Sequence, residues 1–183
     1  MMKPRVISDH DHFQLTIDRL CHQLIENHRD FSNTCIIGVQ PRGIHLSNRI
    51  VNHLNVLLDD PEVQYGKLDV SFYRDDFRRG EKLIKANDTT IEFSIEDKQV
   101  ILVDDVLFTG RTIRASMDAL LDFGRPAKIE LLVLVDRRLS RHVPVQADYI
   151  GMRVDAVRAE YIMVDWMETA GKDTISILEE KDH

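Results

Sequence analysis

The stretch VILVDDVLFTGRT, residues 100–112, limits the folds open to this chain more than any other segment. It starts with an unbroken run of apolar, mostly β-branched residues, which is typical of a strand covered on both faces. Two adjacent carboxylates, Asp104 and Asp105, follow that run, and apolar residues at helical spacing begin at Ile113. The stretch therefore predicts a buried strand, a polar loop at its carboxyl end, and then a helix.

The same alternation of strand and helix patterns repeats along the chain. Strands are expected at 34–39, 68–73, 100–103, 129–135, 147–150 and 160–164, and helices at 14–28, 44–58 and 113–121. Short connections between them predict an α/β fold with a mainly parallel, doubly wound sheet. Because ligands bind such sheets at the carboxyl ends of the strands, we expect the site in the loops after residues 39, 73, 103 and 135.

One polar segment, residues 74–97, breaks this alternation. Its sequence RDDFRRGEKLIKANDTTIEFSIED is highly charged, and its apolar residues fall at strand-like spacing only near the end. We expect a flexible arm or hairpin that leaves the core. The rest of residues 1–183 is expected to form a single domain with it.

Charge and cysteine content exclude several classes of protein. With 24 Lys and Arg against 31 Asp and Glu, the net charge of −7 argues against a surface built as a whole for nucleic acid, although a local basic patch stays open. Cys21 and Cys35 fit no metal or disulfide pattern, so we expect buried thiols in a reducing compartment. The histidines show no metal spacing and are expected at surface or capping positions. No signal peptide or apolar run of about 18 residues occurs, which predicts a soluble, cytoplasmic protein.

The loop after Asp105 has the composition of a phosphate site. Backbone N–H groups at a helix start, together with Thr109, Gly110 and Thr112, can cradle a phosphate. The paired aspartates would repel a phosphate, so they suit sugar hydroxyls or a metal-bound sugar instead. The plainer alternative is that Asp105 or Thr109 caps the helix, but a cap needs only one such residue.

A second loop, Gly38 to Gly43, has the glycine spacing of an ATPase phosphate loop but lacks its chemistry. Ile44 and His45 stand where that motif requires Lys and Ser or Thr, so an ATPase is excluded. The loop places Arg42 beside a glycine, where a guanidinium can hold a diphosphate by paired hydrogen bonds. A plain turn with a solvated arginine fits this segment equally well.

Together these segments resemble one family. Residues 100–112 are similar to the phosphoribosyl pyrophosphate (PRPP) signature of type I phosphoribosyltransferases. More narrowly, the chain resembles the PyrR family, pyrimidine operon regulators with uracil phosphoribosyltransferase activity, over most of residues 5–165. The segments that carry this resemblance are GVQPRGIHL (38–46), YRDD (73–76), VDDVLFTGRT (103–112), GRPAKIELLVLVDR (124–137) and ADYIG (147–151).

The resemblance implies the type I phosphoribosyltransferase fold and the synthesis of UMP and pyrophosphate from uracil and PRPP. It implies that Asp104 and Asp105 bind the ribose hydroxyls, and that Arg42, Gly43 and Arg74 hold the pyrophosphate, with Mg²⁺ bound through PRPP and not directly by the protein. The implied catalytic residues are Asp104, Asp105 and Arg42. The loop residues that would hold the 5-phosphate are Val106, Leu107, Phe108, Thr109, Gly110, Arg111 and Thr112. Uracil would lie at Asp136, Arg137, Tyr149 and Ile150, and the arm would close over PRPP.

Two alternatives stay open for the activity. Purine transferases of this superfamily typically carry a carboxylate at the position of Phe108, so the aromatic residue favours a pyrimidine. A transferase for another base, such as hypoxanthine or orotate, is the first alternative. An RNA-binding regulator with residual enzyme activity is the second.

The family's other role is to bind an attenuator hairpin in pyr mRNA through a basic face of a dimer. A homodimer or homotetramer is therefore implied. Three positions match that interface: Arg19, His22 and Arg141. Three others depart from it: Asp18, Gln146 and Met152. Because these departures remove two cations and add a carboxylate, we expect RNA attenuation to be weakened.

Overall fold

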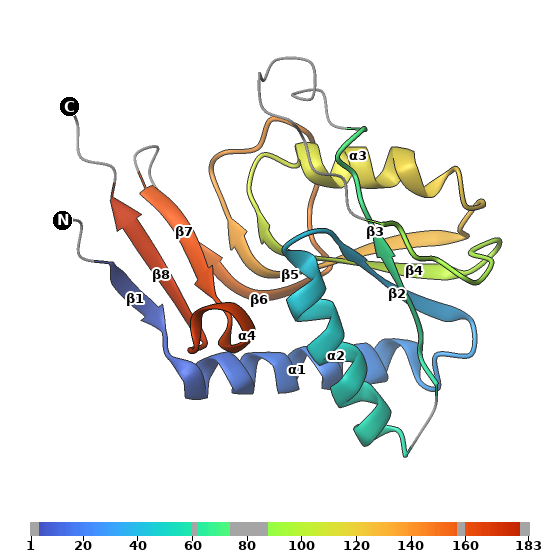
Figure 1. Cartoon of the computed structure of the whole chain (residues 1–183), viewed down its shortest axis with the longest axis horizontal. Helices are drawn as coiled ribbons and strands as arrows, with labels where there is room; N and C mark the ends of the chain where they lie inside the picture. The colour runs from blue at the N-terminus through green and yellow to red at the C-terminus, as the bar shows by residue number, and fades with distance from the viewer. Residues whose placement is uncertain (1–3, 60–61, 74–87, 157–159, 180–183) are drawn as a thin grey trace.

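One parallel sheet organises the molecule. The computed structural model describes residues 4–59, 62–73, 88–156 and 160–179 (Figure 1). Five strands pair in the order β3-β2-β4-β5-β6, and each neighbouring pair is parallel. Their bounds are β2 Thr34–Val39, β3 Gln64–Leu68, β4 Gln99–Leu107, β5 Lys128–Arg137 and β6 Tyr149–Val154.

Helices cover both faces of this sheet. The helices are α1 His10–His28, α2 Gly43–Leu57, α3 Arg111–Leu120 and the short α4 Met167–Ala170. Neighbouring residues of a strand point to opposite faces, so Ile36 and Ile37 of β2 belong to two different cores. Ile36 shares its core with Leu24 of α1 and Ile50 of α2, whereas Ile37 shares its core with Leu120 of α3. The predicted α/β fold with a doubly wound, parallel sheet is confirmed.

A second sheet is antiparallel and joins the two ends of the described chain. Its strands are β1 Arg5–Ser8, β7 Glu160–Asp165 and β8 Thr174–Glu179, in the order β1-β8-β7 (Figure 1). Ile175 and Ile177 of β8 are buried in the core that α1 and α2 share. Of these three strands, the apolar pattern predicted only the one near 160–164.

Three of the predicted strands differ from the observed ones by more than two residues at one end or both. The strand expected at 68–73 ends at Leu68, because the Asp69 carboxylate accepts hydrogen bonds from the Ser71 backbone N–H (2.8 Å) and hydroxyl (2.6 Å) and turns the chain away. The strand expected at 147–150 begins at Tyr149 and runs to Val154. β4 continues four residues past the predicted end at Val103, so both aspartates lie within the strand.

The end of the predicted arm packs against the sheet. Thr90 and Lys67 exchange backbone hydrogen bonds of 2.8 Å, and the Ile95 side chain is fully buried in the α3-side core. The prediction that 74–97 leaves the core is therefore wrong for residues 88–97, because their apolar side chains fill that core. Residues 74–87 lie outside the described residues.

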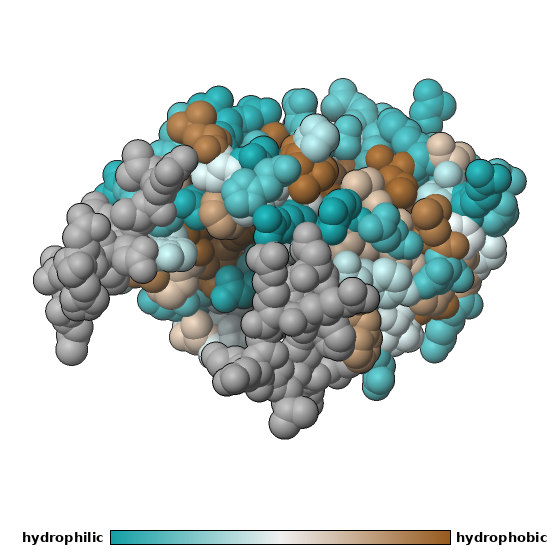
Figure 2. All heavy atoms as spheres, turned by 90° about the horizontal axis from the view of Figure 1, so that it is seen from above, coloured by the Kyte–Doolittle hydropathy of each residue, from teal (hydrophilic) through white to brown (hydrophobic). Residues whose placement is uncertain are grey.

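Both cysteines are buried free thiols, as predicted. Burial raises the pKa of Cys21 to about 12 and that of Cys35 to about 11. No helix in the described part of the chain is long and apolar enough to cross a membrane. Seen from above, the surface has a recess with hydrophobic residues at its floor and mostly hydrophilic residues around it (Figure 2).

Candidate active site

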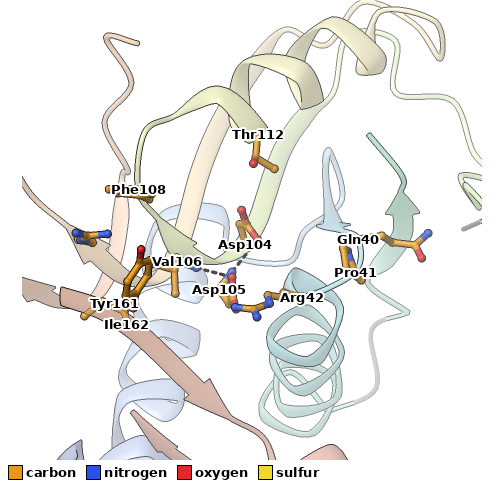
Figure 3. A pocket seen from close by; sticks show the side chains of 11 residues that line it. Gln40, Pro41, Arg42, Asp104, Asp105, Val106, Phe108, Thr112, Tyr161 and Ile162 are labelled. Atoms are coloured by element: carbon orange, nitrogen blue, oxygen red, sulfur yellow. Dashed lines mark hydrogen bonds and ion pairs between the residues drawn. The ribbon is translucent and has the colours of Figure 1, made fainter. Parts of the chain in front are cut away.

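A cavity of about 460 Å³ lies where strands of the main sheet end and β7 of the second sheet passes. In Figure 3, Asp104 and Asp105 lie between Gln40 and Pro41 on one side and Tyr161 and Ile162 on the other. The cavity is lined by Gln40, Pro41, Arg42, Asp104, Asp105, Val106, Phe108, Thr112, Arg137, Tyr161 and Ile162. It lies at the carboxyl ends of β2, β4 and β5, the edge where the alternation of strands and helices predicted a site.

The two aspartates are held by the backbone of their own strand. Asp104 accepts a hydrogen bond from the backbone N–H of Asp105 (2.9 Å), and Asp105 accepts one from Val106 (2.7 Å) (Figure 3). Only 8% of Asp104 and 5% of Asp105 is exposed. Within the described residues, the ion pair of Asp105 is with Arg42, whose guanidinium lies 3.9 Å from the carboxylate.

Two carboxylates this close and this buried resist ionising together. Burial, followed by the charge of Asp105, raises the pKa of Asp104 well above its usual range. Burial also raises the pKa of Asp105, although Arg42 opposes the effect. Such a pair is expensive for folding and is therefore a strong indicator of a functional site.

Gly43 brings the start of α2 into contact with β4. A Cβ atom at this position would lie 2.4 Å from the Val103 carbonyl oxygen and 3.0 Å from Cα of Asp104. Only glycine permits this approach, which keeps Arg42 beside the aspartates.

The loop before α3 encloses a second cavity of about 280 Å³. Gly110, with φ +85°, is the N-cap of α3 and has no side chain to cap the helix. The Thr109 hydroxyl accepts a hydrogen bond of 3.4 Å from the Arg111 N–H, so the plainer capping alternative holds for this one group. The first N–H groups of a helix have no backbone partners within it, which suits such a helix start to an anion. The cavity is lined by Asp104, Val106, Leu107, Phe108, Thr109, Gly110, Arg111, Thr112 and Ile113.

The other half of the main cavity is aromatic and cationic. The guanidinium carbon of Arg137, at the end of β5, lies 4.1 Å from the centre of the Phe108 ring. Tyr161 and Ile162 approach from β7 (Figure 3). Sequence reasoning missed these two residues as site residues, along with Gln40 and Pro41. The signal at 160–164 indicated only a strand, and which sheet that strand joins depends on contacts far apart in the chain.

Two residues predicted at the base site lie elsewhere. Tyr149 and Ile150 pair with Leu132 and Val133 in the middle of β5, whereas the carboxyl end of β6 is Val154. The Tyr149 hydroxyl lies 3.0 Å from Nε2 of the buried His28. β6 continues four residues past its predicted end, so Tyr149 and Ile150 lie away from the carboxyl edge and are not among the residues that line the main cavity.

His28 also corrects the prediction that the histidines lie at the surface or in caps. Its Nε2 atom is 2.8 Å from the Glu130 carboxylate, and both side chains are buried. Burial lowers the pKa of His28, although Glu130 opposes this effect.

Arg141, predicted to bind RNA, is engaged beside the loop that precedes α3. Its guanidinium donates to the carbonyls of Leu107 (3.1 Å) and Arg137 (3.0 Å) and to that of Phe108, and forms an ion pair with Asp136. The predicted site residue Asp136 is thus neutralised within the fold.

The other predicted RNA contacts also have partners in the chain. Arg19 donates to the carbonyls of Ile150 (3.2 Å) and Gly151 (2.6 Å). His22 lies 3.6 Å from the Asp18 carboxylate. Arg74, predicted to hold the pyrophosphate, lies outside the described residues.

Comparison with known proteins agrees with this geometry. Residues 6–163 match the phosphoribosyl transferase domain family. The chain is 43% identical over 177 residues to the bifunctional protein PyrR of Desulfosudis oleivorans, which covers 97% of each chain. It is 41% identical over 172 residues to that of Deinococcus radiodurans, covering 94% of this chain and 93% of that one. The hypoxanthine phosphoribosyltransferase of Trypanosoma cruzi superposes with a TM-score of 0.71 at 19% identity and 97% coverage of both chains, which shows a shared fold. This chain is a phosphoribosyltransferase-domain protein and belongs to the family of the bifunctional PyrR proteins.

Proposed function

We propose that this protein transfers the phosphoribosyl group of PRPP to uracil and so makes UMP and pyrophosphate. The observation that carries the proposal is the pair of buried carboxylates, Asp104 and Asp105, directly before a loop that enters a helix at Gly110. Sugar hydroxyls and a phosphate, spaced as in a ribose 5-phosphate, fit these two features together.

Each part of PRPP has a matching group in the two cavities. Asp104 and Asp105 would accept hydrogen bonds from the ribose hydroxyls. The amides and hydroxyls of the loop from Thr109 to Thr112 would hold the 5-phosphate. Arg42, whose side chain is 70% exposed, is free to turn from Asp105 to the diphosphate.

The carboxylate oxygens also fit Mg²⁺ carried in by PRPP. Mg²⁺ in proteins is typically held by one or two carboxylates together with substrate phosphates and waters, and not by an all-protein cage. Bound there, Mg²⁺ would neutralise charge on the leaving pyrophosphate.

The base would lie in the half of the cavity formed by Phe108, Arg137, Tyr161 and Ile162. A flat ring can contact the exposed aromatic and aliphatic surfaces of these side chains. Since Asp136 is paired with Arg141, the backbone at the end of β5 is the better candidate for reading the edge of the base.

In the reaction, uracil N1 forms a bond to the anomeric carbon and loses its proton, while the bond to pyrophosphate breaks and pyrophosphate keeps the electron pair. Positive charge develops on the ribose and negative charge on the leaving group. Asp104 and Asp105 would stabilise the positive charge, and Arg42 would stabilise the negative charge. Exclusion of water protects the reactive sugar from hydrolysis.

The test is turnover of PRPP with uracil, hypoxanthine and orotate, measured side by side. We expect uracil to be used with a kcat/KM at least about a hundredfold above the others. The double variant Asp104→Asn with Asp105→Asn should lose turnover with every base. Equal use of hypoxanthine would instead support the purine alternative.

We propose further that the protein works in the reducing cytoplasm as a homo-oligomer, consistent with its two buried free thiols. Its relatives carry the name bifunctional, and regulation through pyr mRNA is the second role to test. Because Arg19 and Arg141 already bind backbone carbonyls, this role is proposed to be weak in this chain.

A further inference from the structure

A cluster around Arg49 joins the second sheet to α1 and α2. We call it the Arg49 cluster, and it comprises Phe13, Arg49, Trp166, Glu168 and Asp173. The Nε and Nη2 atoms of Arg49 donate to the two oxygens of Glu168 at 2.9 and 2.7 Å, and Nη2 also donates to Asp173 at 2.7 Å. These hydrogen bonds lower the pKa of Glu168.

Two aromatic rings enclose the same guanidinium. Its carbon lies 5.1 Å from the Trp166 ring centre and 5.6 Å from that of Phe13. Trp166 is 3% exposed and Phe13 is fully buried, so the cation–π contacts are largely shielded from water. Across from Arg49, the ring of His45 stacks on Trp166 at 5.5 Å.

Asp173 is the most buried charge of the cluster, with 2% exposed. Besides Arg49, it accepts hydrogen bonds from the Met167 backbone N–H (2.8 Å) and the Gln14 amide (2.9 Å). His10 also lies 3.3 Å from it. A buried carboxylate with this many partners fixes their geometry, because losing one leaves charge unpaired.

The cluster lies at both ends of the connection between β7 and β8. Trp166 directly follows β7, and Asp173 directly precedes β8. β7 carries Tyr161 and Ile162, which line the active-site cavity. We propose that Arg49 is a positioning residue for the base half of the site, acting on the base through the β7–β8 connection. The proposal rests on the proposed function, since Tyr161 and Ile162 matter only if a base binds beside them.

This role predicts that a change at Arg49 weakens the binding of uracil and leaves the binding of PRPP unchanged. The PRPP half of the site stands on β2, β4, α3 and the start of α2, where Arg42 and Gly43 lie. Arg49 is also on α2, but the partners of its guanidinium lie on α1 and in the β7–β8 connection. A small shift of β7 would therefore weaken contacts to the base and leave those to PRPP in place. If Arg49 only stabilised the fold, its replacement would change kcat and both KM values together, in line with the loss of stability.

The experiment compares Arg49→Lys with Lys172→Met as a matched control. Lys172 lies in the same connection and forms an ion pair of 3.1 Å with Asp165, the last residue of β7, but has no part in the Arg49 cluster. We expect Arg49→Lys to raise the KM for uracil by about tenfold, with kcat and the KM for PRPP within about twofold of wild type. Lys172→Met should match the wild-type enzyme. If Arg49→Lys does not fold, Glu168→Gln takes its place, because it removes only the negative charge of the partly exposed partner of Arg49. This variant should shift the KM for uracil in the same direction.

Trp166 supplies a readout that does not need turnover, because it is the single tryptophan of the chain. UMP should change its emission in the wild type and in Lys172→Met, and the titration midpoint should rise by about tenfold in Arg49→Lys. If Arg49→Lys changes the KM values for uracil and PRPP equally, or changes neither, the proposed role of Arg49 is wrong but the proposed function still stands. Absence of uracil turnover by the wild-type protein would overturn the proposed function as well.

Discussion

The guanidinium of Arg137 and the ring of Phe108 stack across the active-site cavity, 4.1 Å from guanidinium carbon to ring centre. Arg137 is the last residue of β5, and Phe108 is the first residue of the loop between β4 and α3. The contact therefore joins the two segments that would bind the base and the ribose phosphate. Both Phe108 and Arg137 line the main cavity.

This stack predicts how a change at Phe108 separates binding from chemistry. Phe108→Leu keeps an apolar side chain but removes the cation–π contact, which is worth about 0.5–2 kcal/mol. We expect the KM for uracil to rise by about threefold to thirtyfold, with kcat little changed. Steady-state kinetics over both substrates measures this effect. A fall in kcat at an unchanged KM would mean that Phe108 acts in the transition state.

The buried aspartates predict that one substitution lowers the activity and raises the stability of the protein. Asp104→Asn should lower kcat by about a hundredfold or more, since Asn cannot ionise when the developing positive charge of the sugar favours a carboxylate beside it. The same change should raise the free energy of unfolding at neutral pH, because the pKa of Asp104 lies well above its ordinary value of 3.8 in the folded protein.

The pH dependence of that stabilisation has a definite sign. Below 3.8 the carboxyl is protonated in both the folded and the unfolded chain, so the variant gains nothing. As the pH rises above this value, only the unfolded chain ionises readily, and the wild type loses stability relative to the variant. Urea unfolding of both proteins from about pH 4 to pH 8 measures the difference. A gain that is largest in acid would contradict the raised pKa.

The two thiols should be unreactive in the native protein. Burial raises the pKa of Cys21 to about 12 and that of Cys35 to about 11, so neither forms much thiolate at neutral pH. A chromogenic disulfide reagent at about pH 8 should label both only as fast as the protein unfolds. Addition of urea should then give two labels per chain. Rapid labelling without urea would show that one thiol is accessible.

RNA binding should be weak, with a shallower salt dependence than a fully basic interface would give. Asp18 and Met152 replace groups that would favour phosphate, and the Arg19 guanidinium already binds two carbonyls. Each lost phosphate contact makes the plot of log K against log salt less steep, by about 0.7–0.9 in slope. We expect little preference for a pyr attenuator hairpin over an unrelated hairpin, with or without UMP, in fluorescence titrations. Nanomolar binding of the pyr attenuator hairpin, strengthened by UMP, would contradict this prediction and show that the protein binds this RNA as well as acting as an enzyme.

The parts that the sequence predicted well are those set by local pattern. The strand before Asp104, the glycine beside Arg42 and the loop at Gly110 each carry their signal within a few residues, and parallel pairing brings them to one edge. Boundaries were harder. LDVSFY alternates like a strand, yet the Asp69 side chain bonds to Ser71 and ends the pairing.

Contacts between distant parts of the chain could not be predicted. Tyr161 enters the site because β7 pairs with β8 and β8 pairs with β1, a relation that no short pattern contains. Arg141 likewise shows its role only through the carbonyls of Leu107 and Arg137, which lie 34 and 4 residues away in sequence.

The pairing of β1 with β8 sets the order in which a newly made chain can be completed. Arg5 lies opposite Ile177, so β1 has no partner until the chain has been synthesised through β8. The main sheet and the loops at its carboxyl edge need only residues up to Val154 and can form earlier, because domains fold as their segments emerge. β7 gains its neighbour β8 later, so the part of the cavity lined by Tyr161 and Ile162 is completed after the part lined by Asp104 and Asp105.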